Sequence, residues 1–393
     1  MDKKILDSEI QNFITNNIDK DVAKLALQKN PFPEIPWIEI LNQIAAKAKA
    51  KGKLPTFFSA SNIIYPSKIS VEQTSSEKTA WYKSTLISGD TLIDLTGGFG
   101  VDDFYFSKKV KEIIHCEINA GLSEIVRHNF DMLGAGNIKC IAGDSLDVLK
   151  NSNQNFDWIY IDPSRRNDDK GKVFMLKDCL PNVPELLEFY FLHTNNILIK
   201  TAPILDISAG LLELSNVKHI HVVAVENEVK ELLWELSKDY TGDPIIKTVN
   251  ISKGNLNSFA FELPSDGIGA SFALPKRYLY EPNSAIMKSG GFDEISSHYK
   301  IDKLHPHSHL YTADQIIDFP GRIFEIEKII PYTKAELKLF LENKKANITT
   351  RNFPDTVELI RKKWKIKDGG NVYCFFTTNM NNHKIVLICA KIN

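Results

Sequence analysis

The spacing of hydrophobic and polar residues changes twice along the chain. Over residues 7–88, apolar side chains recur every three or four positions, and this period predicts helices. The prolines of 31–36 interrupt the pattern, and 37–53 then predicts one uninterrupted helix. A further helix follows, with Ser75 or Ser76 as its N-cap. The first part of the chain is therefore expected to be a helical region, which we assign to residues 1–70.

From Thr91 onward, short β-branched runs alternate with spacers of helical length. The runs that predict strands are 91–96, 112–117, 137–143, 156–163, 195–201 and 219–226, with a seventh at 257–264. Alternation of this kind is typical of βαβ units with a parallel sheet. We therefore expect an α/β, Rossmann-like, seven-stranded sheet domain over residues 71–270.

The rhythm changes again after Leu274. Successive segments predict strand, helix, strand, helix, strand and strand at 322–330, 334–343, 346–353, 356–366, 371–378 and 383–392. This order suits a small α+β domain better than a continuation of the parallel sheet. The third predicted domain is 271–393.

Composition narrows the class of protein. The chain has 393 residues, 43% hydrophobic and 25% charged, which is typical of a folded globular protein. Its five cysteines form no CxxC pair, the N-terminus lacks a signal-peptide pattern, and apolar runs are only strand-length. We therefore expect a cytoplasmic protein with no membrane span. The sequence leaves the oligomeric state open.

Net charge conceals an uneven distribution. The whole chain carries 48 Lys+Arg and 49 Asp+Glu, a net charge of −1. Residues 271–393 hold 19 Lys+Arg and 13 Asp+Glu, so this tail is +6 and the remainder is −7. A basic tail on an acidic body is compatible with nucleic-acid binding, which the total alone would argue against.

The strongest local motif is DLTGGFG, Asp94 to Gly100, directly after a predicted strand. Gly97, Gly98 and Gly100 would let the backbone turn sharply and approach a ligand closely. A dinucleotide site would favour GxGxxG without an acid before it. The carboxylate of Asp94 would repel a pyrophosphate and attract a cationic amino-acid head group, so the loop favours S-adenosylmethionine over NAD.

Polar residues end the next three predicted strands. Glu117 could accept hydrogen bonds from ribose hydroxyls, and Asp144, supported by Ser145, could accept from an adenine amine. The fourth strand ends at Asp162 and Pro163. Since carboxyl ends of parallel strands share one edge, these groups are expected to converge on one ligand site.

With these motifs the sequence resembles class I S-adenosylmethionine-dependent methyltransferases, specifically those with a helical N-terminal extension and a THUMP-like C-terminal domain. The resemblance implies the seven-stranded class I sheet and a THUMP-like or ferredoxin-like tail. It also implies that Asp94, Gly98, Gly100, Glu117 and Asp144 line the cofactor site. The full set of expected cofactor contacts is Thr79, Asp94, Thr96, Gly97, Gly98, Gly100, Glu117, Asp144 and Ser145.

DPSRR, which begins at Asp162, matches the position where nucleic-acid methyltransferases carry DPP or NPP and an aromatic residue. Here Ser164 replaces the second proline and Arg165 the aromatic residue, so an adenine N6 target is not implied. The expected catalytic residues are Asp162, Pro163, Ser164 and Arg165. Asp162 would hold the acceptor amine or accept its proton, and Arg165 would position a base or a phosphate.

Each candidate also has a structural alternative. Asp144 could simply cap a helix, Thr79 could pack in the core, and Arg165 with Arg166 could form a solvated turn. Cys179 is interpreted as a buried small side chain rather than a nucleophile. The spaced histidines of 305–309 lack accompanying acids or cysteines, so no metal site is expected.

The tail carries a basic cluster beside an amphipathic helix. Its candidate RNA-binding residues are Arg351, Arg361, Lys362, Lys363 and Lys365. The alternative is a solvated helix with one buried face. Our hypothesis is methyl transfer to a base nitrogen of structured RNA, either tRNA or rRNA. A small-molecule or protein acceptor, and an inactive RNA-binding protein, stay open as alternatives.

Overall fold

The computed structural model describes residues 3–152, 154–165, 175–263 and 269–392. The chain forms two compact units. The first comprises Met1–Lys218 and Lys230–Gly242, and the second comprises His219–Val229 and Asp243–Asn393. A search of the described residues for a helix with the length and hydropathy of a membrane span finds none.

Short helices open the first unit. They are η1 (Lys3–Leu6), α1 (Ser8–Asn16), α2 (Val22–Ala26), α3 (Trp37–Lys53), α4 (Pro55–Ser59), α5 (Lys68–Gln73) and α6 (Glu77–Ser84). The helix predicted over 37–53 is confirmed by α3. The predicted cap is confirmed too, because the Ser76 hydroxyl accepts the Thr79 N–H at 3.2 Å at the start of α6.

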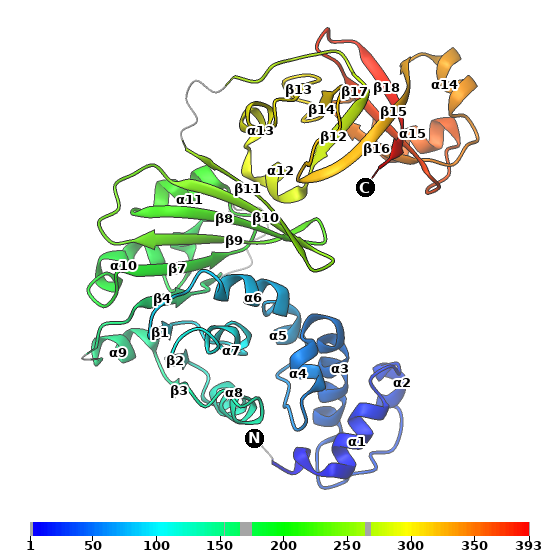
Figure 1. Cartoon of the computed structure of the whole chain (residues 1–393). Helices are drawn as coiled ribbons and strands as arrows, with labels where there is room; N and C mark the ends of the chain where they lie inside the picture. Colours follow the sequence, from blue (N-terminus) through cyan, green and yellow to red (C-terminus); the bar gives the residue numbers. More distant parts are fainter. Residues whose placement is uncertain (1–2, 153, 166–174, 264–268, 393) are drawn as a thin grey trace. The chain divides into compact units, whose positions relative to one another are not determined.

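A parallel sheet forms the body of the first unit (Figure 1). Its strands are β1 (Thr91–Asp94), β2 (Glu112–Glu117), β3 (Ile138–Ala142), β4 (Trp158–Ile161), β7 (Asn196–Thr201) and β9 (Glu228–Ser237). They lie in the order β9-β7-β4-β1-β2-β3, parallel except for β9, which runs antiparallel to β7. Because chain order reverses direction at the β4/β1 pair, the crevice beyond these two strands is the expected ligand position of the fold.

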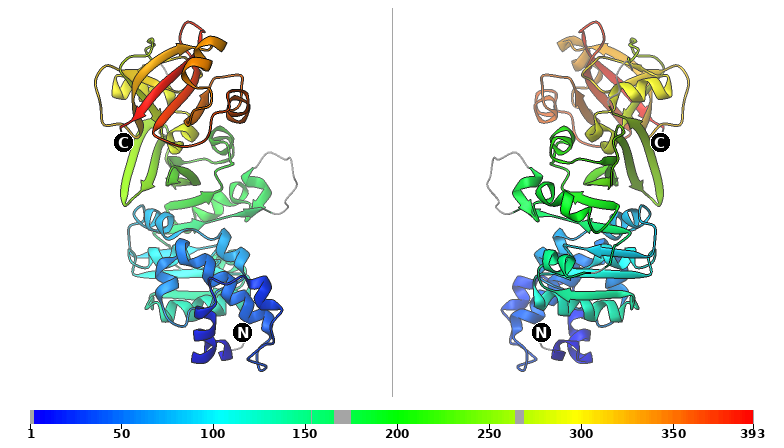
Figure 2. Two further views of the ribbon diagram at one scale, coloured as in Figure 1. Left: turned by 90° about the vertical axis from the view of Figure 1, so that its right-hand side faces the viewer. Right: turned by 90° about the vertical axis from the view of Figure 1, so that its left-hand side faces the viewer.

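Helices connect these strands, as the βαβ pattern predicts. They are α7 (Val101–Phe106), α8 (Ala120–Met132), α9 (Ser145–Lys150), α10 (Val183–Tyr190) and α11 (Ile207–Glu213), with the short segments β5 (Ser164–Arg165), η2 (Leu176–Asp178) and β6 (Cys179–Leu180) after β4. Figure 2 shows the N-terminal helices in blue beside the cyan half of this sheet. Phe57 of α4 and Phe130 of α8 are buried in one shared core.

The second unit contains two sets of strands. The first set is β8 (Val217–Val225), β10 (Ile245–Ser252) and β11 (Asn255–Glu262), in the order β11-β10-β8. The second set is β12 (Tyr278–Pro282), β13 (Asp302–Lys303), β14 (Tyr311–Ala313), β15 (Gly321–Pro331), β16 (Asn347–Arg351), β17 (Val372–Thr378) and β18 (Lys384–Lys391), in the order β13-β14-β12-β15-β18-β17-β16. Its helices are α12 (Ser284–Ser289), α13 (Phe292–Tyr299), α14 (Lys334–Phe340) and α15 (Val357–Trp364).

The six elements predicted after residue 321 are confirmed as β15, α14, β16, α15, β17 and β18. The sequence pattern missed β9, β10 and the elements from β12 to β14. Strand β9, EVKELLWELS, has one β-branched residue and is rich in Glu and Leu, which favour helices, so it lacks the β-branched run by which the other strands were predicted. Strands β13 and β14 span only two and three residues, which is too short for any periodicity.

Candidate functional site

The glycine loop lies between β1 and α7, as predicted. Gly100 has a φ of +75°, a backbone conformation that favours glycine. Gly97 is constrained differently, because a Cβ there would overlap the imidazole of His115. The loop backbone thus lies directly on the end of β2, and a larger residue at Gly97 would push it away.

Glu117 ties the end of β2 to this loop. Its Oε2 accepts the Gly98 N–H at 3.0 Å, and its Oε1 accepts the Asn119 N–H at 2.7 Å. The two motifs that the sequence predicts to converge therefore do so. The carboxylate is half-buried, at the carboxyl edge of the sheet.

Thr96 joins the glycine loop to the loop after β4. Its N–H and hydroxyl both donate to Asp94 Oδ1, at 2.7 and 3.0 Å. The same hydroxyl accepts the Asp162 N–H at 2.7 Å. One side chain therefore fixes the distance between the predicted cofactor loop and the predicted catalytic aspartate.

Behind the loop lies a buried cluster of titratable groups, Asp94, Asp103 and His115. Asp103 Oδ2 and His115 Nδ1 are 2.6 Å apart, and both side chains are fully buried. Burial, together with the neighbouring carboxylate of Asp103, raises the pKa of Asp94 well above its usual range. Burial and the carboxylate of Asp102 do the same to the pKa of Asp103, while burial lowers that of His115.

These three residues could also be considered as metal ligands, because each offers an atom within 4.8 Å of the others. However, the 2.6 Å contact between His115 and Asp103 leaves no room for an ion between those two atoms. These two atoms are therefore joined by a short hydrogen bond.

Asp162 has a partner that the sequence did not reveal. Lys200, at the carboxyl end of β7, donates from Nζ to Asp162 Oδ2 at 2.5 Å. Burial by itself would lower the pKa of Lys200, but the carboxylates of Asp162, Asp102 and Glu231 outweigh burial and raise it. Lys200 is therefore a permanent cation beside Asp162, and it holds one oxygen of this carboxylate.

A second ionic group of the first unit is centred on Lys83. The fully buried Lys83 of α6 donates to Glu231 of β9 at 2.9 Å and lies 3.1 Å from Asp102 of α7. Asp102 also accepts hydrogen bonds from Tyr160 and Ser75, both at 2.8 Å. Burial acts to raise the pKa of Asp102, but Lys83, Lys200 and these hydrogen bonds lower it overall.

The remaining predicted cofactor contacts have clear local roles. Asp144 is exposed and caps α9, accepting the Leu146 N–H at 2.8 Å. Ser145 is the first residue of that helix. Thr79 is buried, and its hydroxyl donates to the Ser76 carbonyl at 3.0 Å. The contacts of these residues with a cofactor stay predictions.

Around the predicted catalytic motif, Pro163 is buried and Ser164 is exposed. Ser164 and Arg165 form β5, paired with Leu180 and Cys179. Cys179 is fully buried, as expected of a packing residue. Residues 166–174 lie outside the described residues, so Arg166 and its neighbouring acids are not placed.

The basic cluster of the second unit divides into paired and exposed residues. Arg351 donates to Glu281 at 3.0 Å, and Arg361 donates to Asp368 at 2.5 Å. The exposed members are Lys362, Lys363 and Lys365. Since both arginines are held by carboxylates, the lysines are the members of this set best placed to meet a partner.

Comparison with solved structures identifies the relatives of this chain. A Porphyromonas gingivalis W83 protein described as a "putative methyltransferase" matches with a TM-score of 0.88 at 30% identity, covering 100% of this chain and 99% of that chain. The chain belongs to this methyltransferase family. Its α/β class I fold and THUMP-like tail agree with the predicted fold class.

Family models match the tail of this family member in two parts. A ferredoxin-like domain covers residues 278–320, and a THUMP domain-like segment covers 321–391. The predicted α+β tail is thus a composite of two modules. Comparison with curated proteins gives no match.

Two further solved structures resemble only part of the chain. TrmK of M. capricolum, in complex with S-adenosylhomocysteine, matches at 19% identity over 41% of this chain and 68% of that chain, with a TM-score of 0.33. An rRNA methylase from Streptococcus thermophilus matches at 13% identity over 41% of this chain and 95% of that chain, with a TM-score of 0.30.

Proposed function

We propose that this chain transfers the methyl group of S-adenosylmethionine to a base nitrogen of structured RNA, either tRNA or rRNA, in the cytoplasm. In this proposal residues 1–70 are a helical extension, 71–270 carry the transfer and 271–393 bring the RNA. The single observation that carries the proposal is the convergence of Asp94, Glu117 and the Asp162–Lys200 pair at the ends of neighbouring strands. Thr96 joins Asp94 to Asp162, and Glu117 accepts the Gly98 N–H. Membership of a methyltransferase family supports it.

The acidic side chains at these strand ends fit S-adenosylmethionine better than a phosphate-bearing cofactor. Carboxylates mark the ends of three strands: Asp94 is the last residue of β1, Glu117 is the last residue of β2, and Asp144 lies two residues after β3. Carboxylates suit an ammonium group, ribose hydroxyls and an adenine amine, whereas they would repel a pyrophosphate. When bound, the cofactor supplies a methyl group already activated by its sulfonium. The protein then has to align the acceptor and exclude water.

Asp162 is proposed to orient the acceptor nitrogen and to take its proton. Lys200 occupies Oδ2 of this carboxylate, so Oδ1 is the oxygen left for the acceptor. Lys200 is a positioning residue in this arrangement. Pro163 and Ser164 would shape the backbone that receives the base, and Arg165 would contact the base or a phosphate.

The acceptor can be tested without knowing it in advance. Total RNA from cells lacking the gene is incubated with purified protein and radiolabelled S-adenosylmethionine, and nucleosides from both strains are compared by mass spectrometry. We expect one methylated nucleoside to be missing from the deletion strain and restored in vitro. Label transfer to protein or to small molecules, with RNA unlabelled, would refute the proposed acceptor.

The proposed role of Asp162 has its own test. Asp162→Ala should leave S-adenosylhomocysteine affinity nearly intact in calorimetry, while methyl transfer is lost. Equal transfer by the variant and the parent protein would remove Asp162 from the mechanism. Absence of any cofactor binding by the parent protein would instead favour the inactive RNA-binding alternative.

A further inference from the structure

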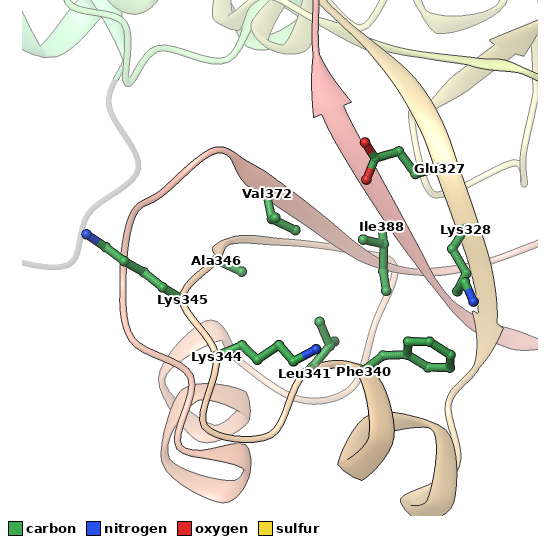
Figure 3. A pocket seen from close by; sticks show the side chains of 9 residues that line it. All are labelled: Glu327, Lys328, Phe340, Leu341, Lys344, Lys345, Ala346, Val372 and Ile388. Atoms are coloured by element: carbon green, nitrogen blue, oxygen red, sulfur yellow. The ribbon is translucent and has the colours of Figure 1, made fainter.

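The THUMP-like segment contains a pocket that is lined by residues other than the predicted RNA-binding ones (Figure 3). Its volume is about 250 Å³. Strand β15 supplies one wall through Glu327 and Lys328, and the end of α14 supplies Phe340 and Leu341. The loop after α14 contributes Lys344, with Lys345 and Ala346 beside it. None of these residues belongs to the basic cluster predicted from the sequence.

Lys328, Lys344 and Lys345 line this pocket with a single acid, Glu327, and in Figure 3 the Lys345 side chain points away from the other lining side chains. Within the described part of the chain, no ion pair joins Lys328, Lys344 or Lys345 to a carboxylate. All three side chains are exposed, as is Glu327. This differs from Arg351 and Arg361, whose guanidinium groups are already paired. The lining of the pocket therefore carries a local excess of positive charge, with three lysines and one acid.

The floor of the pocket is apolar. It consists of Leu341 with Val372 of β17 and Ile388 of β18, which belong to or pack against the core of this segment. Phe340 is half-buried at the rim, and the Lys328 Nζ lies 4.1 Å from its ring centroid. In Figure 3 the Lys344 side chain extends across the pocket towards Leu341. The cation thus lies over one face of the Phe340 ring, so a base would have to meet the other face or displace the Lys328 side chain.

We propose that this pocket binds a nucleotide unit of single-stranded RNA, with the base against Phe340 and the apolar floor and the phosphate at Lys328 and Lys344. A nucleotide combines a planar, largely apolar base with a neighbouring anion, which matches this arrangement. An acidic peptide would supply the anion and leave the ring and floor without a planar partner. The choice of RNA rests on the proposed function, and the charge and shape of the pocket are independent of it.

The test uses the full chain and a fluorescein-labelled single-stranded RNA 12-mer, followed by anisotropy between 50 and 200 mM salt. The pocket variant is Lys328→Gln/Lys344→Gln, which removes the two lysines proposed to meet the phosphate. The matched control, Lys334→Gln/Lys338→Gln, removes the same charge from exposed positions of α14 that do not line the pocket. We expect the pocket variant to bind about tenfold more weakly. The slope of log K against log salt should fall by about 0.7 per lost phosphate contact.

Phe340→Leu tests the stacking part separately, since it keeps an apolar side chain and removes the ring. Affinity should fall about fivefold or more, with little change in salt dependence. Thermal unfolding of each variant checks that the segment stays folded. Equal loss in the pocket and control variants, no effect of either, or no RNA binding by the parent protein would overturn the proposal.

A 12-residue polyglutamate peptide and AMP serve as competitors. Displacement of the RNA by the peptide at equal concentration would indicate a general anion site and overturn the assignment to RNA. Calorimetry with S-adenosylhomocysteine on the same proteins separates the two proposals. If the cofactor binds and the pocket variants bind RNA as well as the parent protein does, only the pocket proposal is refuted. If the parent protein does not bind the cofactor, the proposed function is refuted.

Discussion

Replacing Lys83 with Met should destabilise the first unit far more than its single charge suggests. Lys83 is fully buried between Glu231, which is 2% exposed, and Asp102, which is 11% exposed. The substitution keeps the length of the side chain but leaves two buried carboxylates without their cation. Removing one partner of a buried ion pair costs about 3–5 kcal/mol. For a unit of this size, that corresponds to a fall in Tm of roughly 6–20 °C.

The pH dependence of this loss has a defined sign. Burial already raises the pKa of Glu231 in the folded protein, and Lys83 is the largest influence that opposes the rise. Without Lys83 the folded-state pKa rises further above the unfolded value. The stability that such a carboxyl group contributes is fully present below its unfolded-state pKa and is lost as pH rises from there through the folded-state pKa. The deficit of Lys83→Met should therefore be larger at pH 8 than at pH 5.

Thermal and urea unfolding, followed by circular dichroism, measure this loss directly. The matched control is Lys111→Met, which breaks the exposed Lys111–Asp90 pair at 2.8 Å. Exposed pairs contribute only about 0–1 kcal/mol, so Tm should change little. Adding Glu231→Gln to Lys83→Met should recover part of the loss by removing one buried charge. A loss as small as that of the control, or equal at both pH values, would refute the reasoning.

Three further predictions concern two site residues, Gly97 and Lys200, and Lys53 of α3. Gly97→Ala should weaken S-adenosylhomocysteine binding in calorimetry at least tenfold, because the new Cβ overlaps His115; unchanged affinity would mean that the loop moves freely. Lys200→Met should lower methyl transfer to RNA while cofactor affinity stays near the parent value, and Lys200→Arg should recover part of the rate; full activity of the Met variant would contradict a positioning role. Burial, Lys200 and Lys230 lower the pKa of Lys53 to about 8, so about half of its amine should be neutral at pH 8. Acetic anhydride should therefore label Lys53 well before the exposed Lys51, as measured by peptide mass spectrometry. Equal labelling of the two lysines would refute this.

Much of the fold follows from local pattern. The helix α3 and the buried strands β1, β2, β4 and β7 have strong periodicity or β-branched runs, and they form where expected. Strand β9 was missed because its sequence, EVKELLWELS, has one β-branched residue and is rich in the helix-favouring Glu and Leu. Before it, the chain turns through Glu226 and Asn227, both with positive φ. Glu-Asn does not carry the Asn-Gly signature of such turns.

Site residues could be predicted from the sequence only where a polar side chain lies at the end of a predicted strand. Asp94, Glu117 and Asp162 each occupy such a position, so sequence order alone places them at one edge. Lys83 and Glu231 are 148 positions apart, and no local pattern relates them. Their pairing depends on α6 packing near β9, which is a property of the tertiary structure.

The core that α3 and α4 share with α7 and α8 limits how this protein can be divided in the laboratory. A shortened chain that begins at residue 71 would lack the buried side chains of Ala50, Leu54 and Phe57. Their loss would expose Phe104 and Phe130, which lie in the helices that follow the glycine loop and β2. The helical extension thus covers the hydrophobic core on which the glycine loop of residues 94–100 rests. Expression of the catalytic part alone should therefore begin upstream of α3.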